Sequence, residues 1–88
     1  MSISPSAEAY LDIETGPEGS VTILGIYRED RGIRQLVGVD ITDLAVWEAL
    51  EGVTTLCTFN GDRFDLPILE RHTRLDIRSH FQSLDLLR

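Results

Sequence analysis

The sequence predicts a mixed α/β domain in which three strands precede a helix, a buried strand and a second helix. Residues 7–39 contain three strand-like segments separated by turn signals, and residues 40–75 alternate between helical and strand patterns. This order is typical of a mixed sheet with helices packed on it. Because the chain has 88 residues, we expect residues 1–88 to form one domain.

Three consecutive segments have the composition of strands. Residues 7–15, AEAYLDIET, alternate apolar and polar side chains, and a turn rich in glycine follows them. Residues 21–28, VTILGIYR, are rich in β-branched and aromatic residues. A short polar turn leads from there into residues 33–39, IRQLVGV. Since both connections are short, we expect a three-stranded antiparallel meander.

Residues 40–52 change to a helical period. An apolar stripe recurs at the spacing of one helix face, formed by Leu44, Trp47 and Leu50. Thr42 or Asp43 can cap the start, because short polar side chains accept hydrogen bonds from the first free N–H groups. Gly52 follows the segment, where glycine is favoured. We therefore expect a short amphipathic helix.

The last third of the chain contains a second strand-helix passage. Residues 54–59, TTLCTF, are a short apolar run that is typical of a strand buried on both faces. A helix is expected from Asp65 to about residue 74, because Asp and Pro, here Pro67, are favoured near helix starts. Residues 76–88 permit two interpretations: a last strand followed by a helix that begins at Asp85, or one broken helical segment.

The charge and composition limit the classes of function. The formal net charge is −7, so binding of nucleic acid through a basic surface is not expected. No apolar run approaches the roughly 20 residues of a membrane helix, and the amino terminus lacks the pattern of a secretory signal. The lone Cys57 has no partner for an internal disulfide. We expect a cytoplasmic protein that does not bind a membrane.

Acidic residues occur at chemically suggestive places in two predicted elements. Asp12 and Glu14 are two residues apart on one strand, so their side chains share a face, with Cα atoms roughly 6.5–7 Å apart. Close like charges are costly unless a cation compensates them, and Mg²⁺ or Mn²⁺ accepts carboxylate ligands. The alternative for this pair is a solvent-exposed acidic strand face. Asp65 follows a buried strand at the edge where α/β sheets place their sites, or it only caps a helix.

Two motifs then resemble a known family. AYLDIETG, followed about fifty residues later by TFNGDRFDLPILERH, resembles the first two motifs of the DEDD superfamily of 3′–5′ exonucleases, which have a ribonuclease H-like fold. Within that superfamily, the chain looks like predicted exonucleases related to the proofreading domain of family B DNA polymerases. The matching positions are Asp12, Glu14, Asn60, Phe64 and Asp65. The resemblance covers nearly the whole chain and implies a truncated ribonuclease H-like domain, of which residues 1–88 are the N-terminal portion.

The resemblance also implies an activity. The family hydrolyses phosphodiester bonds of DNA or RNA, here from a single-stranded 3′ end, with two Mg²⁺ or Mn²⁺ ions. By this likeness Asp12, Glu14 and Asp65 would hold the ions and act in catalysis. Asn60 would orient a carboxylate or a nucleotide, or is only a turn residue. Phe64 would stack on a terminal base, or packs in the core. A fourth acid and a Tyr or His, from a third motif, are expected downstream of Arg88.

The residues near the carboxyl terminus leave one alternative open. His80 and Asp85 have the His-x-x-x-x-Asp spacing of one subgroup's third motif, but they follow Asp65 by only about twenty residues. We expect Asp85 to cap a helix instead. The alternative function is a catalytically incomplete ribonuclease H-like binding or assembly module. Its uncovered apolar surface would favour a homodimer.

Overall fold

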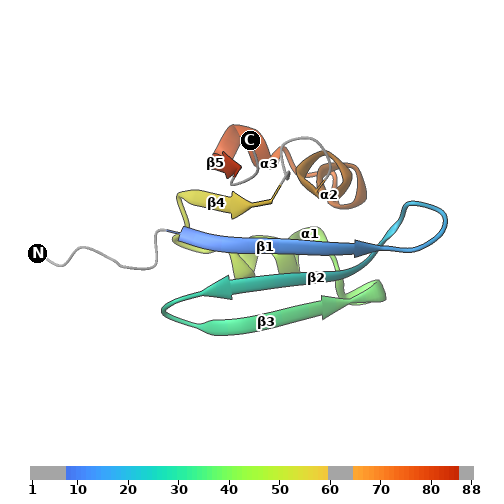
Figure 1. Ribbon diagram of the computed structural model, residues 1–88, viewed down its shortest axis with the longest axis horizontal. Coiled ribbons are helices and arrows are strands. Elements are labelled where there is room, and N and C mark those ends of the chain that lie inside the picture. Colours follow the sequence, from blue (N-terminus) through green and yellow to red (C-terminus); the bar gives the residue numbers. More distant parts are fainter. Residues whose placement is uncertain (1–7, 60–64, 86–88) are drawn as a thin grey trace, which may run out of the picture.

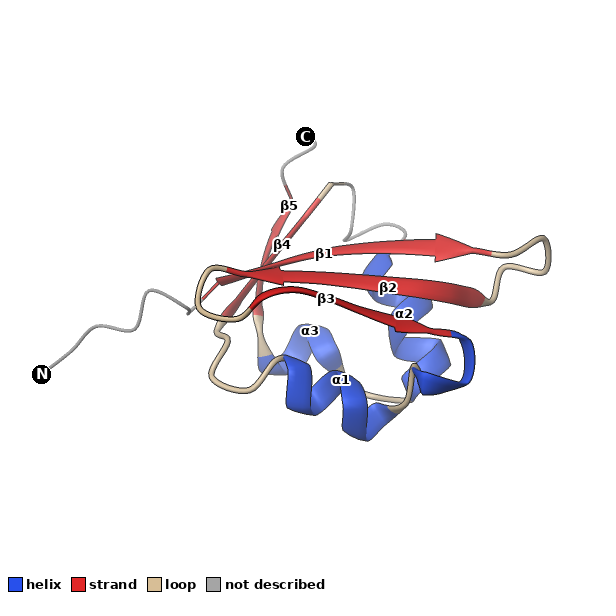
Figure 2. Ribbon diagram, turned by 90° about the horizontal axis from the view of Figure 1, so that it is seen from below, coloured by secondary structure: helices blue, strands red, loops and turns tan. Residues whose placement is uncertain are grey.

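The fold is a five-stranded mixed sheet with helices on one face (Figures 1 and 2). The computed structural model describes residues 8–59 and 65–85. The strand order is β3-β2-β1-β4-β5, from bottom to top in Figure 1. The elements are β1 (Glu8–Thr15), β2 (Val21–Arg28), β3 (Gly32–Val37), a 3₁₀ turn η1 (Gly38–Asp40), α1 (Asp43–Ala49), β4 (Thr55–Thr58), α2 (Asp65–Thr73), α3 (Ile77–His80) and β5 (Gln82–Asp85).

The strand directions confirm the predicted fold class. Strands β1, β2 and β3 form an antiparallel meander. Strands β4 and β5 then extend the sheet on the other side of β1, and both run parallel to it. As predicted for residues 54–59, β4 is buried on both faces, because Leu56, Cys57 and Thr58 are all inaccessible to solvent. The sheet is therefore mixed, and its centre is the first strand of the chain.

The core lies between the sheet and the helices, on what we call the inner face. Figure 2 shows α1, α2 and α3 on this one face. The strands contribute alternate apolar residues, which are Ala9, Leu11, Leu24, Ile26, Leu36 and Leu56. The helices contribute Val46, Ala49, Leu66, Leu69 and Ile77. Burial of each large aliphatic side chain stabilises the fold by about 1.5–3 kcal/mol relative to exposure.

Only one residue of the apolar stripe, Leu50, is buried in the core at α1. Val46 and Leu50 are buried, whereas Leu44 is 78% exposed and Trp47 is 44% exposed. The Trp47 ring instead packs edge-on against Phe81 and His80, with ring centroids 5.8 and 5.2 Å away. Trp47 therefore covers the connection between α3 and β5, and the predicted amphipathic helix has Val46 and Leu50 on its buried side.

The ends of α1 follow the sequence signals. The Thr42 hydroxyl accepts a hydrogen bond from the Ala45 N–H at 3.1 Å, so Thr42, and not Asp43, is the N-cap. After the helix, Gly52 has a φ of +82°, which only glycine adopts without strain. The predicted start and stop signals therefore act where they were expected.

The tail agrees in part with the first of the two interpretations. Helix α2 ends at Thr73, and Arg74 adopts a left-handed φ of 62°, which interrupts the helical path. A short helix α3 follows, and β5 then pairs in parallel with β4. Asp85 is thus the last residue of a strand. The helix expected to begin at Asp85 lies outside the described residues.

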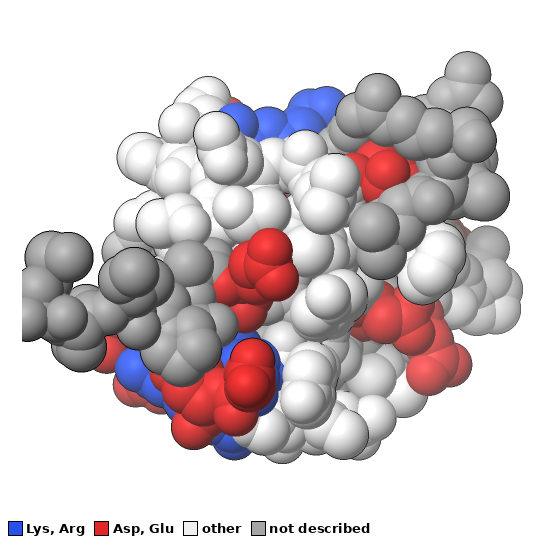
Figure 3. All heavy atoms as spheres, turned by 60° about the vertical axis from the view of Figure 1, so that its left-hand side comes forward, with Lys and Arg blue, Asp and Glu red and all other residues white. Residues whose placement is uncertain are grey.

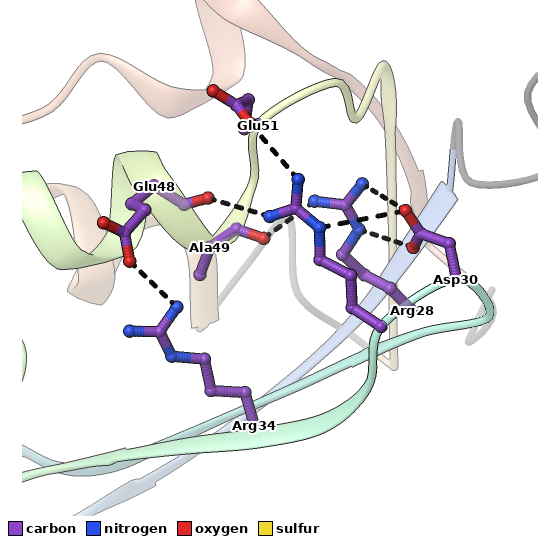
Figure 4. A network of polar contacts seen from close by, with 7 residues as sticks. Arg28, Asp30, Arg34, Glu48, Ala49 and Glu51 are labelled. Carbon is purple, nitrogen blue, oxygen red and sulfur yellow. Dashed lines mark hydrogen bonds and ion pairs between the residues drawn. The ribbon is translucent and has the colours of Figure 1, made fainter.

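A buried arginine connects the β2–β3 hairpin to the end of α1 (Figure 4). Arg28 is 3% exposed, and its Nε and Nη2 donate to the two carboxylate oxygens of Asp30 at 3.0 Å each. Its Nη1 donates to the C=O of Ala49, the last residue of α1, also at 3.0 Å. The guanidinium is therefore well satisfied, and one of the carbonyls left free at the helix end gains a donor.

No helix among residues 8–59 and 65–85 covers the second face of the sheet, which we call the open face. The strand register aligns one residue from each strand in a row across it. The row comprises Ile33, Tyr27, Tyr10, Cys57 and Leu84. All except Cys57 are substantially exposed. This row is an exposed apolar band, which single soluble domains normally keep small.

Candidate active site at the carboxyl edge of the parallel strands

Three parallel strands end at the same edge of the sheet, which we call the carboxyl edge. Strands β1, β4 and β5 point in the same direction (Figure 1). Each is associated with an acid at this end: Asp12 in β1, Asp65 at the start of the helix that follows β4, and Asp85 at the end of β5. This is the edge at which parallel α/β sheets commonly bind ligands.

Asp12 and Glu14 lie on the open face of β1, and both side chains are exposed. Across the antiparallel pair, Asp12 is opposite Gly25 and Glu14 is opposite Ile23. The register shifts directly after Glu14, and the Thr22 hydroxyl donates to the Glu14 C=O at 3.0 Å. The two acids therefore lie just before the regular pairing of β1 with β2 is interrupted. An irregularity of this kind changes the direction of the strand.

Asp65, the first residue of α2, interacts with the same strand, β1. Its half-buried carboxylate accepts a hydrogen bond from the backbone N–H of Ile13, the residue between Asp12 and Glu14. Burial raises the pKa of the Asp65 carboxyl, and the negative charges of Asp12 and Asp85 raise it further, while the hydrogen bond lowers it. Asp65 is therefore close enough to both acids for their charges to act on it.

His80 and Asp85 lie at opposite ends of β5. His80 packs on Trp47 before the strand begins, whereas Asp85 is its last residue. At about 3.3 Å per strand residue, the two side chains start more than about 10 Å apart. They therefore cannot serve one reacting group as a pair, although Asp85 by itself lies at the carboxyl edge. The role predicted for Asp85, a helix cap, did not indicate that it ends a strand at this edge.

The donor chemistry of the edge suits a hard divalent cation. Carboxylate oxygens are the ligands that Mg²⁺ and Mn²⁺ prefer, and a cation would relieve the repulsion that acts on Asp65. Within residues 8–59 and 65–85, however, no three His, Cys, Asp or Glu side chains are close enough together to hold a metal ion. Asn60 and Phe64, the two predicted substrate contacts, lie outside the described residues.

Other candidates contribute to packing in the described structure. Cys57 is buried in β4, and burial, together with the charge of Glu8, raises the pKa of its thiol.

None of the helices in the described ranges is long and apolar enough to span a membrane. On the side of the molecule seen in Figure 3, uncharged side chains form a continuous area, and acidic side chains gather in separate groups around it.

A five-stranded sheet in this order, with acids at the ends of its parallel strands, defines a ribonuclease H-like α/β protein. A family model described as RNase_H superfamily matches residues 9–88. The chain therefore belongs to the RNase H superfamily, as the resemblance of the two motifs predicted. Neither the search of curated proteins nor the search of solved structures returned a significant match. Membership supports a nuclease-type function in general, with a nucleic acid as substrate and divalent metal ions as cofactors.

Proposed function

We propose that the chain carries part of the active site of a DEDD-type, metal-dependent 3′–5′ exonuclease acting on DNA or RNA. The observation that supports this most is the hydrogen bond from the Ile13 N–H to the Asp65 carboxylate. It joins Asp65, an acid of the second sequence motif, to the strand that carries Asp12 and Glu14 of the first. A structural cap would not need to reach a strand so distant in sequence.

In this proposal each acid has a definite task. Asp12, Glu14 and Asp65 would hold two Mg²⁺ or Mn²⁺ ions, which would supply an activated water and charge stabilisation of the leaving oxygen. The Ile13 N–H occupies part of the acceptor capacity of Asp65 and orients the carboxylate, so its other lone pairs are available to a ligand. Asn60 and Phe64, just before α2, contact the terminal nucleotide. A Tyr or His outside the described residues orients the attacking water.

The overall charge adds a condition to substrate binding. With a net charge of −7, the chain repels a polynucleotide through its own field. Positive charge at the carboxyl edge would offset this field locally, where the acids lie. Binding of single-stranded nucleic acid is therefore expected to depend on divalent ions more strongly than on monovalent salt.

The metal site can be tested by thermal unfolding in Mn²⁺ and Mg²⁺. We expect millimolar Mn²⁺ to raise the Tm of the chain, because a ligand that binds only the folded state stabilises it. Asp12→Asn should abolish the rise. Asp76→Asn, which removes the same charge from an exposed position before α3, should retain it. An unchanged Tm at millimolar ion would refute the metal site.

Catalysis requires a separate assay. End-labelled single-stranded DNA and RNA are incubated with the chain in Mn²⁺, and the products are separated by length. A ladder that shortens from the 3′ end, and that is absent with Asp12→Asn, supports the exonuclease. Products shortened from the 5′ end would contradict the proposed polarity.

A second candidate function is a binding or assembly module that does not cut. The apolar row on the open face favours it, because a second copy of the chain could bury this surface. A folded, dimeric chain that binds Mn²⁺ but leaves every labelled substrate intact would support this candidate over the first.

A further inference from the structure

A depression with a polar rim lies between the β1–β2 turn and helix α2. Its volume is about 380 Å³. Ser20 and Val21 line it from the turn and the start of β2, and Ile68, Arg71 and His72 line it from α2. Because Val21 is buried and Ile68 packs against the core, the floor of the depression is apolar. Its polar groups, Ser20 and Arg71, belong to exposed residues.

Arg71 is a cation that the fold does not use in an ion pair. Most arginines in the described part of the chain pair with an acid: Arg28, Arg31, Arg34 and Arg78. Within residues 8–59 and 65–85, the Arg71 guanidinium and the Ser20 hydroxyl have no ion-pair or hydrogen-bond partner. The alternative role of Arg71 is to stabilise the last turn of α2, where it lies. Its N–H donors are nevertheless available to a ligand.

The depression lies at the same end of the sheet as the candidate acids, on the side of the inner face that α2 covers (Figure 2). Val21 pairs with Thr15, which directly follows Glu14. Helix α2 begins at Asp65, which is hydrogen-bonded to β1. Since each residue advances an α-helix by about 1.5 Å, Arg71 lies about 9 Å further along the axis. A strand of a few nucleotides that ends at the acids can therefore reach Arg71.

The donors of the depression suit a phosphate group. A guanidinium presents a planar fork of N–H groups that matches two phosphate oxygens, and a hydroxyl can donate to a further oxygen. Nucleic acid is also the class of substrate that membership of the RNase H superfamily supports. Glu18 adds one carboxylate to the lining, but it is exposed, so its repulsion of a phosphate is screened by salt.

We propose that this depression binds a backbone phosphate of single-stranded nucleic acid, with the Arg71 guanidinium as the main donor and the Ser20 hydroxyl as the second. The inference rests on the proposed function, which supplies the polynucleotide whose end lies at the acids. Arg71 holds the strand and takes no part in hydrolysis. Its removal should therefore weaken binding of the strand, with little effect on the stability of the free chain.

The test measures binding of a labelled short oligothymidylate by fluorescence anisotropy, at constant Mg²⁺ and increasing KCl. Its phosphorothioate linkages keep the backbone charge and resist cleavage. Arg71→Gln is expected to raise the Kd about three- to tenfold, as for loss of one charge-assisted hydrogen-bonded contact. The slope of log K against log salt should become shallower by about 0.7, the value for one phosphate contact with a single strand.

Matched variants separate a phosphate site from a general effect of charge. Arg74→Gln removes the same charge directly after α2 from a side chain that does not line the depression, so its Kd should change less than about twofold. Ser20→Ala should raise the Kd by a smaller factor than Arg71→Gln and leave the salt slope unchanged. Glu18→Gln should lower the Kd, because it removes the repulsive group. A second oligomer with uncharged methylphosphonate linkages should bind the unmodified chain and Arg71→Gln equally.

The outcomes distinguish this inference from the proposed function. Equal losses of affinity in Arg71→Gln and Arg74→Gln overturn the phosphate site, and so does a loss with the uncharged oligomer as large as with the charged one. An unmodified chain that does not bind the charged oligomer also overturns it, whereas the exonuclease is decided by the separate cleavage assay. The expected effect of Arg71→Gln without any ladder of products keeps the phosphate site and contradicts the exonuclease. Should Arg71→Gln not fold, unchanged Kd values in both Ser20→Ala and Glu18→Gln overturn the inference.

Discussion

The Asp65 carboxylate accepts a hydrogen bond from the backbone N–H of Ile13, so the first residue of α2 is fixed to the strand that carries the other candidate acids. The β2–β3 hairpin, α1 and β4 all separate the two residues in sequence. The contact therefore exists only because β4 is placed beside β1. It is also unfavourable in part, because it keeps a carboxylate half-buried near like charges.

Asp65→Asn is expected to stabilise the metal-free protein at neutral pH. The pKa of the Asp65 carboxyl is raised in the folded state, so this group favours folding only while it is protonated. The stabilisation that the protonated carboxyl gives is fully present below the pKa of the group in the unfolded state, about 3.9. It is lost as the pH rises through the higher pKa of the group in the folded state. Asparagine does not ionise, so the stability that ionisation of Asp65 costs at neutral pH is regained. Its side-chain oxygen can still accept the hydrogen bond from the Ile13 N–H.

Calorimetry across a pH series checks this prediction. The Tm of Asp65→Asn should exceed that of the unmodified chain at pH 7, and the difference should shrink toward zero as the pH falls below about 4. Asp76→Asn, at an exposed position, controls for the loss of one carboxylate from the surface. A Tm lower than that of the unmodified chain at pH 7 would show that hydrogen bonding by the carboxylate outweighs its desolvation.

Arg28→Met is expected to destabilise the fold by about 2–4 kcal/mol, because it removes two hydrogen bonds to Asp30 and one to the Ala49 C=O from a buried position. Urea unfolding measures the change. The matched variant is Arg34→Met, since Arg34 contacts Glu48 in a pair that is largely exposed on both sides. Its cost should stay below about 1 kcal/mol. Equal costs for the two variants would contradict the special role of the buried arginine.

The Cys57 thiol should react slowly in the native protein. It is buried in β4, and burial raises its pKa, so both access and the fraction of thiolate are reduced. With a coloured thiol reagent at pH 8, we expect reaction to be limited by opening of the fold and to become fast in denaturant. A native rate equal to the denatured rate would show that β4 is not protected in solution.

The open face should mediate self-association if it is an interface. Sedimentation of the unmodified chain is then expected to depend on concentration, and Ile33→Lys, in the apolar row, should shift the protein toward the monomer. Val39→Lys is the matched control, because Val39 is 92% exposed but belongs to the turn after β3. A monomer at every concentration would exclude this interface between copies.

The sequence predicted the fold because its local signals were consistent. Turn residues, β-branched runs and the Thr42 cap each act over a few residues, and the elements between them formed close to the predicted limits. The core side of α1 could not be predicted, since the spacing of Leu44 and Trp47 is helical whichever side faces the sheet. That choice depends on α3 and Phe81, which pack against Trp47 from the other end of the chain.

The candidate site was predictable only in its residue types. Asp12, Glu14 and Asp65 were recognised from their motifs, and these identities remain a prediction, with Asn60 and Phe64 outside the described residues. The place of Asp85 was not predictable. A last strand was one of two interpretations of residues 76–88, and only the parallel register with Thr58 shows that Asp85 ends this strand and which face the acid occupies.

The central position of β1 determines the order in which the site can assemble. Its pairing with β2 closes a short turn, whereas the pairing of Glu8 with Thr55 joins segments at distant points in the chain. Short closures are faster, so the meander can present Asp12 and Glu14 before β4 and β5 have docked. The placement of Asp12 and Glu14 therefore depends on local closure of the meander, whereas the placement of Asp65 at the edge depends on a long-range pairing with a higher entropic cost.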